Sequence, residues 1–161
     1  MHNVQEILKE WDFFDQAITT HGFTEYHRDY RLNVSFYGAD KIEHPVEYLF
    51  RGCVEVHYES RVISNLADDT FIDYVRWEEA GYPGGYVWAV NFVEAYPGWR
   101  YIEDSPRAAV WADKVGLSMH ELVIDTGTFI LTLVFHDLSV KSLEQIGENQ
   151  PVATEDEPTP Q

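Results

Sequence analysis

The sequence predicts a single α+β domain in which an N-terminal amphipathic helix and two shorter helices pack against a mainly antiparallel sheet. Three observations indicate this fold class. The chain has 161 residues, a common size for one domain. Apolar residues recur at helical spacing near the N-terminus. In several later segments they alternate with polar residues, as half-buried strands require.

The N-terminal helix is expected between Asn3 and Gly22. Its apolar residues recur at steps of three and four residues: Ile7, Leu8, Trp11, Phe14 and Ile18. Asn3 and Glu6 resemble a capping box, and Gly22 is a typical stop signal. The pattern therefore predicts an amphipathic helix over most of this segment.

Two strands are expected next. The first covers residues 30–36, where apolar and polar residues alternate. The second begins at Tyr48, and its apolar face holds Tyr48, Phe50, Val54, Val56 and Tyr58. Its polar face holds Arg51, Cys53, Glu55, His57 and Glu59. The sequence thus predicts one strand over residues 48–59 with an apolar and a polar face.

Two short helices are expected further along the chain. Asp68 and Asp69 begin the first, which should end at Gly81, and a strand around residues 86–92 follows it. The second helix lies between Ser105-Pro106 and Gly116, with an N-cap, a proline at its first position and a glycine stop.

A hairpin completes the predicted domain. Residues 121–125 and 129–140 should form its two strands, and the apolar run from Phe129 to Phe135 should lie centrally in the sheet. We place the domain at residues 1–143. Residues 144–161 are rich in Glu, Pro and Thr and predict a disordered acidic tail.

The chain is strongly acidic, with 28 acidic and 11 basic residues and a formal net charge of −17. Residues 1–143 hold 23 of the acids, so the acidity belongs to the domain as well as to the tail. This charge disfavours phosphate backbones and anionic lipid, and we expect no nucleic-acid or membrane partner. It suits a basic protein partner, because complementary charge speeds encounter.

Cysteine usage and hydropathy bear on the compartment. Cys53 is the only cysteine, which excludes an intramolecular disulfide and a four-thiolate zinc site. No apolar run reaches 18 residues, and the N-terminus lacks the basic and apolar regions of a secretory signal. We expect a cytoplasmic protein.

The polar face of the second strand is a candidate metal site. Cys53, Glu55 and His57 are ligand types for divalent metals. Alternate residues on a strand lie about 6.5 to 7 Å apart, so a second element such as His120 or His136 must contribute. His136 would also be the better base if Cys53 were a nucleophile. The alternative interpretation is a polar sheet face with a half-buried thiol.

An aromatic stretch interleaved with Gly and Pro is a candidate binding surface. Its residues are Tyr82, Tyr86, Trp88, Tyr96 and Trp99. The same rings could line the pocket of an apolar-ligand carrier, or belong to the core.

Asp125-Thr126-Gly127 is the triplet found in aspartic proteases. That chemistry requires a second Asp at the site and a supporting apolar segment ending in Gly. The only segment of that kind is Ile146-Gly147, which follows a polar residue near the tail. The alternative interpretation is an ordinary hairpin turn.

Several short blocks occur in order along the chain: Phe50 to His57, Gly85 to Trp88, Tyr96 to Gly98, Asp104 to Ala109, Met119 to Glu121 and Leu133 to Leu138. Over residues 28–141 they resemble a family of small bacterial proteins called YxiG-like, with the first helix outside the match. The resemblance carries over no catalytic residue or cofactor. Because some relatives are named for genes near those of wall-associated toxins, it implies an immunity or interaction role.

The sequence contains no complete catalytic motif, and we expect a non-catalytic binding protein without a cofactor, an immunity-type partner of a basic toxin. The first alternative is a metal-binding domain or metal-dependent enzyme that uses Cys53, Glu55, His57 and His136. The second is an apolar-ligand carrier. Convergence of the Cys, Glu and His side chains in a cleft would favour the first alternative. An enclosed cavity lined by aromatic residues would favour the second.

Overall fold

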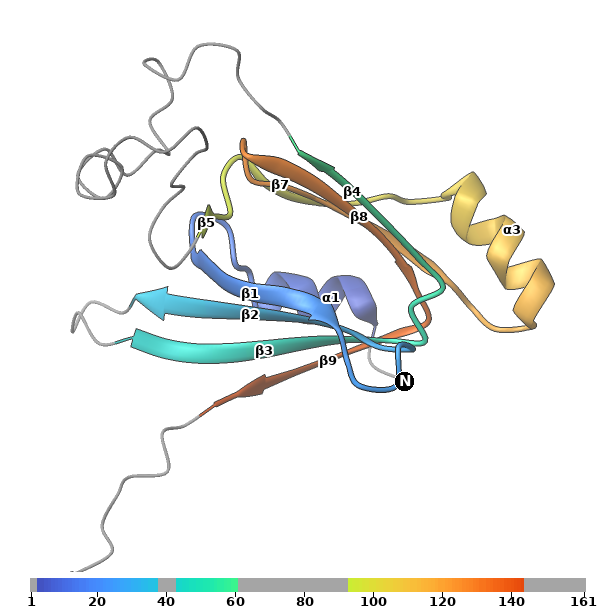
Figure 1. Cartoon of the computed structure of the whole chain (residues 1–161). Helices are drawn as coiled ribbons and strands as arrows, with labels where there is room; N and C mark the ends of the chain where they lie inside the picture. The colour runs from blue at the N-terminus through green and yellow to red at the C-terminus, as the bar shows by residue number, and fades with distance from the viewer. Residues whose placement is uncertain (1–2, 38–42, 61–92, 144–161) are drawn as a thin grey trace, which may run out of the picture.

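The computed structural model describes residues 3–37, 43–60 and 93–143, which form two antiparallel sheets and two helices (Figure 1). The strands are β1 Ala17–Phe23, β2 Tyr30–Tyr37, β3 Glu43–Arg51, β4 Glu55–Ser60, β5 Val93–Glu94, β6 Gly98–Tyr101, β7 His120–Asp125, β8 Phe129–Phe135 and β9 Asp137–Ser142. The helices are α1 Val4–Glu10 and α3 Pro106–Val115. The strand orders are β5-β1-β2-β3-β9 and β4-β8-β7-β6. The predicted α+β domain with mainly antiparallel strands is confirmed.

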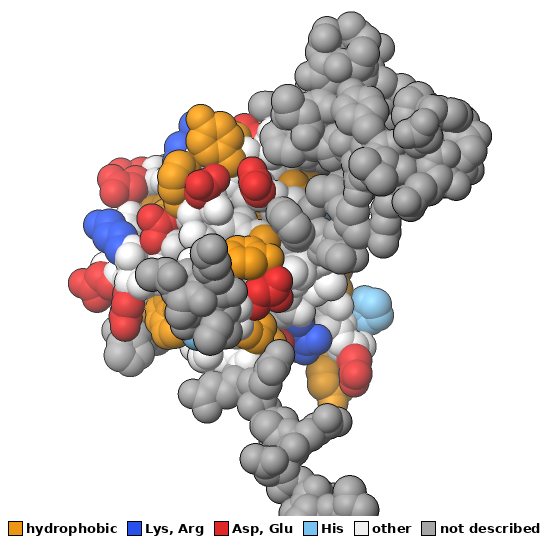
Figure 2. All heavy atoms as spheres, turned by 90° about the vertical axis from the view of Figure 1, so that its left-hand side faces the viewer, with side chains coloured by type: hydrophobic (Ala, Val, Ile, Leu, Met, Phe, Trp, Pro, Cys, Tyr) orange, Lys and Arg blue, Asp and Glu red, His pale blue; other side chains and the backbone are white. Residues whose placement is uncertain are grey.

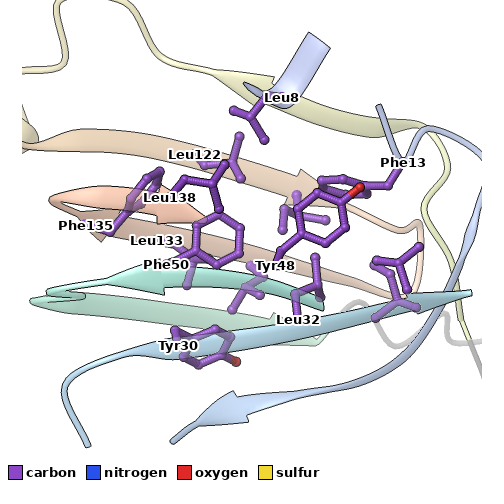
Figure 3. Packing of buried hydrophobic residues seen from close by; sticks show 14 of the residues in the cluster. Leu8, Phe13, Tyr30, Leu32, Tyr48, Phe50, Leu122, Leu133, Phe135 and Leu138 are labelled. Carbon is purple, nitrogen blue, oxygen red and sulfur yellow. The ribbon is translucent and has the colours of Figure 1, made fainter. Parts of the chain in front are cut away.

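The two sheets pack face to face around one hydrophobic core (Figure 3). Phe50 of β3 meets Phe135 of β8 across the sheets, with ring centroids 4.9 Å apart in an edge-to-face arrangement. Helix α1 packs against β9 and contributes Leu8. The buried Tyr48 hydroxyl donates a hydrogen bond to the Trp11 carbonyl (2.7 Å), which fixes the end of α1 to β3. The core therefore ties the N-terminal segment to both sheets.

The chain passes from one sheet to the other at Gly52. This residue has a φ of 58°, a conformation that favours glycine, and its N–H donates to the Asp29 carboxylate. The prediction of one continuous strand over residues 48–59 is therefore wrong. Its first part is β3 in the five-stranded sheet and its second part is β4 in the four-stranded sheet.

A second crossing occurs at His136, beside the first. The His136 N–H donates to the Arg51 carbonyl (2.9 Å), and a Cβ added at Gly52 would lie 3.2 Å from the His136 Cβ. The predicted strand over residues 129–140 is therefore two strands, β8 and β9, in different sheets. Its apolar run is central as expected, because β8 lies between β4 and β7.

The first helix is much shorter than the sequence predicts. It ends at Glu10, and Ala17–Phe23 pair with β2 as strand β1. The Asp12 carboxylate accepts a hydrogen bond from the Phe14 N–H, a local turn that competes with helical bonding. Ile18 is buried in the strand, as it would have been in the helix, so apolar spacing alone did not separate the two structures.

Helix α3 agrees closely with its prediction and is fastened to the outer face of the four-stranded sheet. Ser105 caps it through the Ala108 N–H, and Gly116 ends it with a φ of 71°. The Ser105 hydroxyl also donates to the Glu121 carboxylate, which is nearly buried beneath the helix. Arg107 spans Glu121 and Glu55 at 4.0 and 3.4 Å.

Three expectations fall outside the described residues: the helix over residues 68–81, the strand over residues 86–92 and the tail over residues 144–161. Within the described part of the chain, no helix is long and apolar enough to cross a membrane.

Candidate functional site

A tight turn over residues 12–16 lies at the end of the sandwich where β5 pairs with β1 (Figure 1). The Asp12 carboxylate accepts hydrogen bonds from the Phe14 N–H (3.0 Å) and from the Trp99 indole (2.8 Å). The Asp15 N–H donates to the Ala95 carbonyl at 2.9 Å. Asp15 itself has a φ of 59°, which Asp tolerates better than most residues. These bonds fasten the turn to the β5–β6 connection.

The turn holds the ring of Phe14 at the surface. Its Cδ2 atom would lie only 2.9 Å from a Cβ added at Gly98, so the ring rests against the glycine backbone. The Tyr96 ring is its neighbour, with centroids 5.9 Å apart and ring planes inclined at 55°. Phe14 is 48% exposed and Tyr96 is 53% exposed. Two large rings are thus held in place without being buried.

Gln16 extends this surface to the end of β2. Its side-chain oxygen accepts from the Tyr37 N–H (3.2 Å), and its side-chain nitrogen donates to the Phe14 carbonyl (3.5 Å). The Tyr37 hydroxyl donates to the Glu43 carboxylate at 2.8 Å, and this bond raises the pKa of Tyr37. Tyr37 is 51% exposed.

Six residues make up this surface, which we call the acidic edge: Phe14, Tyr37, Tyr96, Asp15, Glu43 and Glu94. All six are exposed. The segments that carry them, residues 12–17, 35–37, 43–46 and 93–98, contain no Lys or Arg. The ion pairs among the described residues involve other carboxylates, those of Glu47, Glu55 and Glu121. Figure 2 looks onto this end of the molecule, where red acidic and orange apolar side chains lie close together and a few blue basic side chains are also seen.

A cleft of about 510 Å³ lies near the N-terminal end of α1, where β7 begins and β8 crosses to β9. His120 and His136 line it together with Asp137. The His120 Nδ1 is 2.7 Å from the Tyr101 hydroxyl, and the His136 Nδ1 donates to the Ser118 carbonyl at 2.7 Å. Burial lowers the pKa of His120, as does the neighbouring His136, whereas Asp137 acts in the opposite direction.

The imidazole rings of the histidine cleft can donate or accept a proton, but with the other described residues they form no metal centre. Because each Nδ1 is engaged, each ring has only its Nε2 left for a ligand. Among the described residues, no group of three or more His, Cys, Asp or Glu side chains is arranged to hold a metal ion. The fit of the protein to a divalent metal is therefore poor in this part of the chain.

A model of the YxiG-like protein family matches residues 1–154. The chain belongs to this family. The match is longer than the resemblance over residues 28–141 and takes in α1, which was expected to lie outside it. The acidic edge, including the turn over residues 12–16, is therefore part of the YxiG-like region.

Two further comparisons complete this result. No curated protein matches the YxiG-like chain. Among solved structures, it is similar to an uncharacterized protein from Neisseria gonorrhoeae at 11% sequence identity and a TM-score of 0.41. That alignment covers 80% of this chain and 92% of the other.

The four residues of the metal hypothesis lie in different surroundings. Cys53 is buried, its thiol contacts the Glu55 carbonyl at 3.5 Å, and burial raises its pKa to about 12. The Glu55 carboxylate accepts from the Trp111 indole at 2.7 Å under α3. His57 is exposed on β4, whereas His136 lies in the histidine cleft. The structure therefore brings His136 to His120 rather than to the strand face.

The predicted aromatic surface is divided. Tyr96 belongs to the acidic edge, and Trp99 is half-buried, with its ring 6.1 Å from the core residue Phe13. Tyr82, Tyr86 and Trp88 lie outside the described residues. The cleft at His120 and His136 is not lined by this aromatic stretch.

Asp125-Thr126-Gly127 forms the turn of the β7–β8 hairpin. The Asp125 carboxylate accepts from the Gly127 N–H (2.9 Å), and the Thr126 hydroxyl donates to the Phe129 carbonyl (3.0 Å). The side chains of the triplet therefore form hydrogen bonds with the backbone of the turn, as the turn interpretation predicts.

The sequence did not identify the acidic edge as a unit. Phe14 was assigned to the buried face of the first helix, and the acids on the edge were counted only as general charge. A signal does exist, because Asp12 and Asp15 flank Phe13-Phe14 and Asp favours turns over helix interiors.

Proposed function

We propose that this protein is a non-catalytic binding protein whose acidic edge captures a basic protein, in an immunity-type complex with a cationic toxin. One observation carries the proposal. Three half-exposed rings, Phe14, Tyr37 and Tyr96, lie in segments that carry exposed carboxylates and contain no Lys or Arg.

The chemistry of the edge suits protein recognition. Aromatic side chains are enriched at the centres of protein interfaces, and they are common among the few residues that carry most of the binding energy. Carboxylates around them steer a basic partner toward the site and exclude acidic proteins. The overall charge of −17 acts in the same direction over a longer range.

The turn that carries Phe14 is held in place by hydrogen bonds. Asp12 fixes the backbone of Phe14, and the Asp15–Ala95 and Ala95–Gln16 backbone bonds join the turn to β5. A surface that is already ordered loses little conformational entropy on binding, so more of the contact energy appears as affinity.

The proposal is tested with a charge variant, Asp15→Asn, Glu43→Lys and Glu94→Lys, in which Asn keeps the left-handed conformation at position 15. The matched control, Asp113→Asn, Glu10→Lys and Glu25→Lys, changes the net charge equally at exposed positions outside the edge. Each protein is used as bait in lysate at low salt, and retained proteins are identified by mass spectrometry.

We expect the wild-type chain and the control to retain one basic protein, which salt releases and the edge variant fails to retain. Retention of the same partner by the edge variant and the control would contradict the proposal, and so would a partner that is not basic.

A further inference from the structure

We propose that Phe14 and Tyr96 form a binding site for an arginine side chain, which we call the arginine seat. Arginine rather than lysine is then the residue recognised in the partner. This inference rests on the proposed function and names the chemistry of its central contact.

The Phe14 and Tyr96 rings are inclined to each other rather than parallel. Their centroids are 5.9 Å apart, and their planes are inclined at 55°. This spacing is too small to admit a flat group between parallel rings, since each stacking contact needs about 3.5 Å. A guanidinium can instead stack on the exposed face of one ring while its methylene stem packs against the other, within the range of a cation–π interaction.

Two exposed carboxylates belong to the same two segments as the rings. Asp15 follows Phe14 directly, and Glu94 lies two residues before Tyr96. The Asp15 N–H donates to the Ala95 carbonyl and the Ala95 N–H to the Gln16 carbonyl, so the two segments run side by side. Both carboxylates are exposed, and neither belongs to an ion pair of the described residues.

This combination favours arginine over lysine. The guanidinium is planar, more weakly hydrated than an ammonium, and can hydrogen-bond a carboxylate through two parallel N–H groups while its face rests on a ring. A lysine ammonium must shed a tightly held hydration shell to approach the same rings. Charge alone would not discriminate between the two residues.

Contacts within the protein position the arginine seat without a ligand. Gly98 has a φ of 111° and leaves room for the Phe14 ring, while Asp12 and Ala95 fix the backbone on either side of it. These contacts hold the Phe14 ring in place although it is 48% exposed.

The test uses two synthetic peptides of equal length and charge, one with four arginines and one with four lysines, titrated by calorimetry into the full chain. We expect the arginine peptide to bind about fivefold more tightly. The double variant Phe14→Leu and Tyr96→Leu should reduce this ratio to about one while both peptides still bind. The matched control, Phe23→Leu and Tyr26→Leu, removes two exposed rings elsewhere and should keep the preference.

Equal binding of the two peptides to the wild-type chain would overturn the arginine seat. The proposed function would survive that result if the edge charge variant weakened both peptides. If neither peptide responded to the charge variant, the arginine seat and the proposed acidic edge would both be wrong.

Discussion

Phe14 lies against Gly98 so closely that a Cβ added to this glycine would be 2.9 Å from the Phe14 ring. The contact joins the turn after α1 to the first residue of β6, two segments separated by most of the chain. It explains how an aromatic side chain remains fixed at the surface, and its removal has a predictable effect on stability.

Gly98→Ala should lower the free energy of unfolding by about 2 kcal/mol, because alanine disfavours a φ of 111° and its methyl group displaces Phe14. Chemical denaturation measures this change. Gly22→Ala is the control, since nothing lies within 4 Å of its added Cβ, and it should have little effect. Equal stability of the two variants would mean that Phe14 does not rest on Gly98.

Ser105→Ala should destabilise the protein by about 1 to 2 kcal/mol. The hydroxyl caps α3 through the Ala108 N–H and donates to the nearly buried Glu121 carboxylate, so its loss leaves two polar groups without this partner. Ser142→Ala, at an exposed position in β9, serves as control and should be neutral. A neutral effect at Ser105 would show that α3 is not fastened through this cap.

The pH dependence of stability should reflect His120. Its pKa is lowered in the folded state by burial and by His136, so the unfolded chain binds more protons than the folded chain. Stability attributable to His120 is therefore present above about pH 6.5 and is lost as the pH falls through the lowered folded pKa.

The measurement is the free energy of unfolding at about pH 7.5 and about pH 5.5. His120→Gln should lose less stability over this interval than the wild-type chain, and His57→Gln is the control variant at an exposed site. An unchanged pH dependence in His120→Gln would contradict the structural placement of this ring.

The sequence predicted correctly those helices and strands that begin and end at residues with a strong local preference, such as caps and turn residues. Ser105-Pro106 and Gly116 contain the N-cap, the first-turn proline and the left-handed stop, and α3 follows them closely. Strand β2 and the β7–β8 hairpin likewise follow the alternation and turn chemistry of the sequence.

The remaining features depend on tertiary contacts. Ile18 suits a helix and a strand equally, and pairing with β2 decides between them. Gly52 and His136 mark the two crossings between sheets, but a continuous strand pattern runs through both positions. The crossings are seen only in the backbone conformation of Gly52 and in the contacts that the two residues make.

The candidate site was predicted only in fragments. Tyr96 was identified as a surface aromatic, and His120 and His136 as possible partners, but their surroundings come from distant segments. Exposure of Phe14 follows from the Asp12 turn and from Gly98, which is 84 residues away in the sequence. Such long-range packing leaves no periodic signal.

The most direct test of the central claim is the association rate of the captured basic protein, measured against ionic strength. If the acidic edge steers the partner, the wild-type rate constant should fall by about tenfold or more between about 20 and 200 mM salt. The Asp15→Asn, Glu43→Lys and Glu94→Lys variant should then associate more slowly, and its rate should depend less steeply on salt. Wild-type and variant rates that coincide at every salt concentration would contradict recognition at the acidic edge.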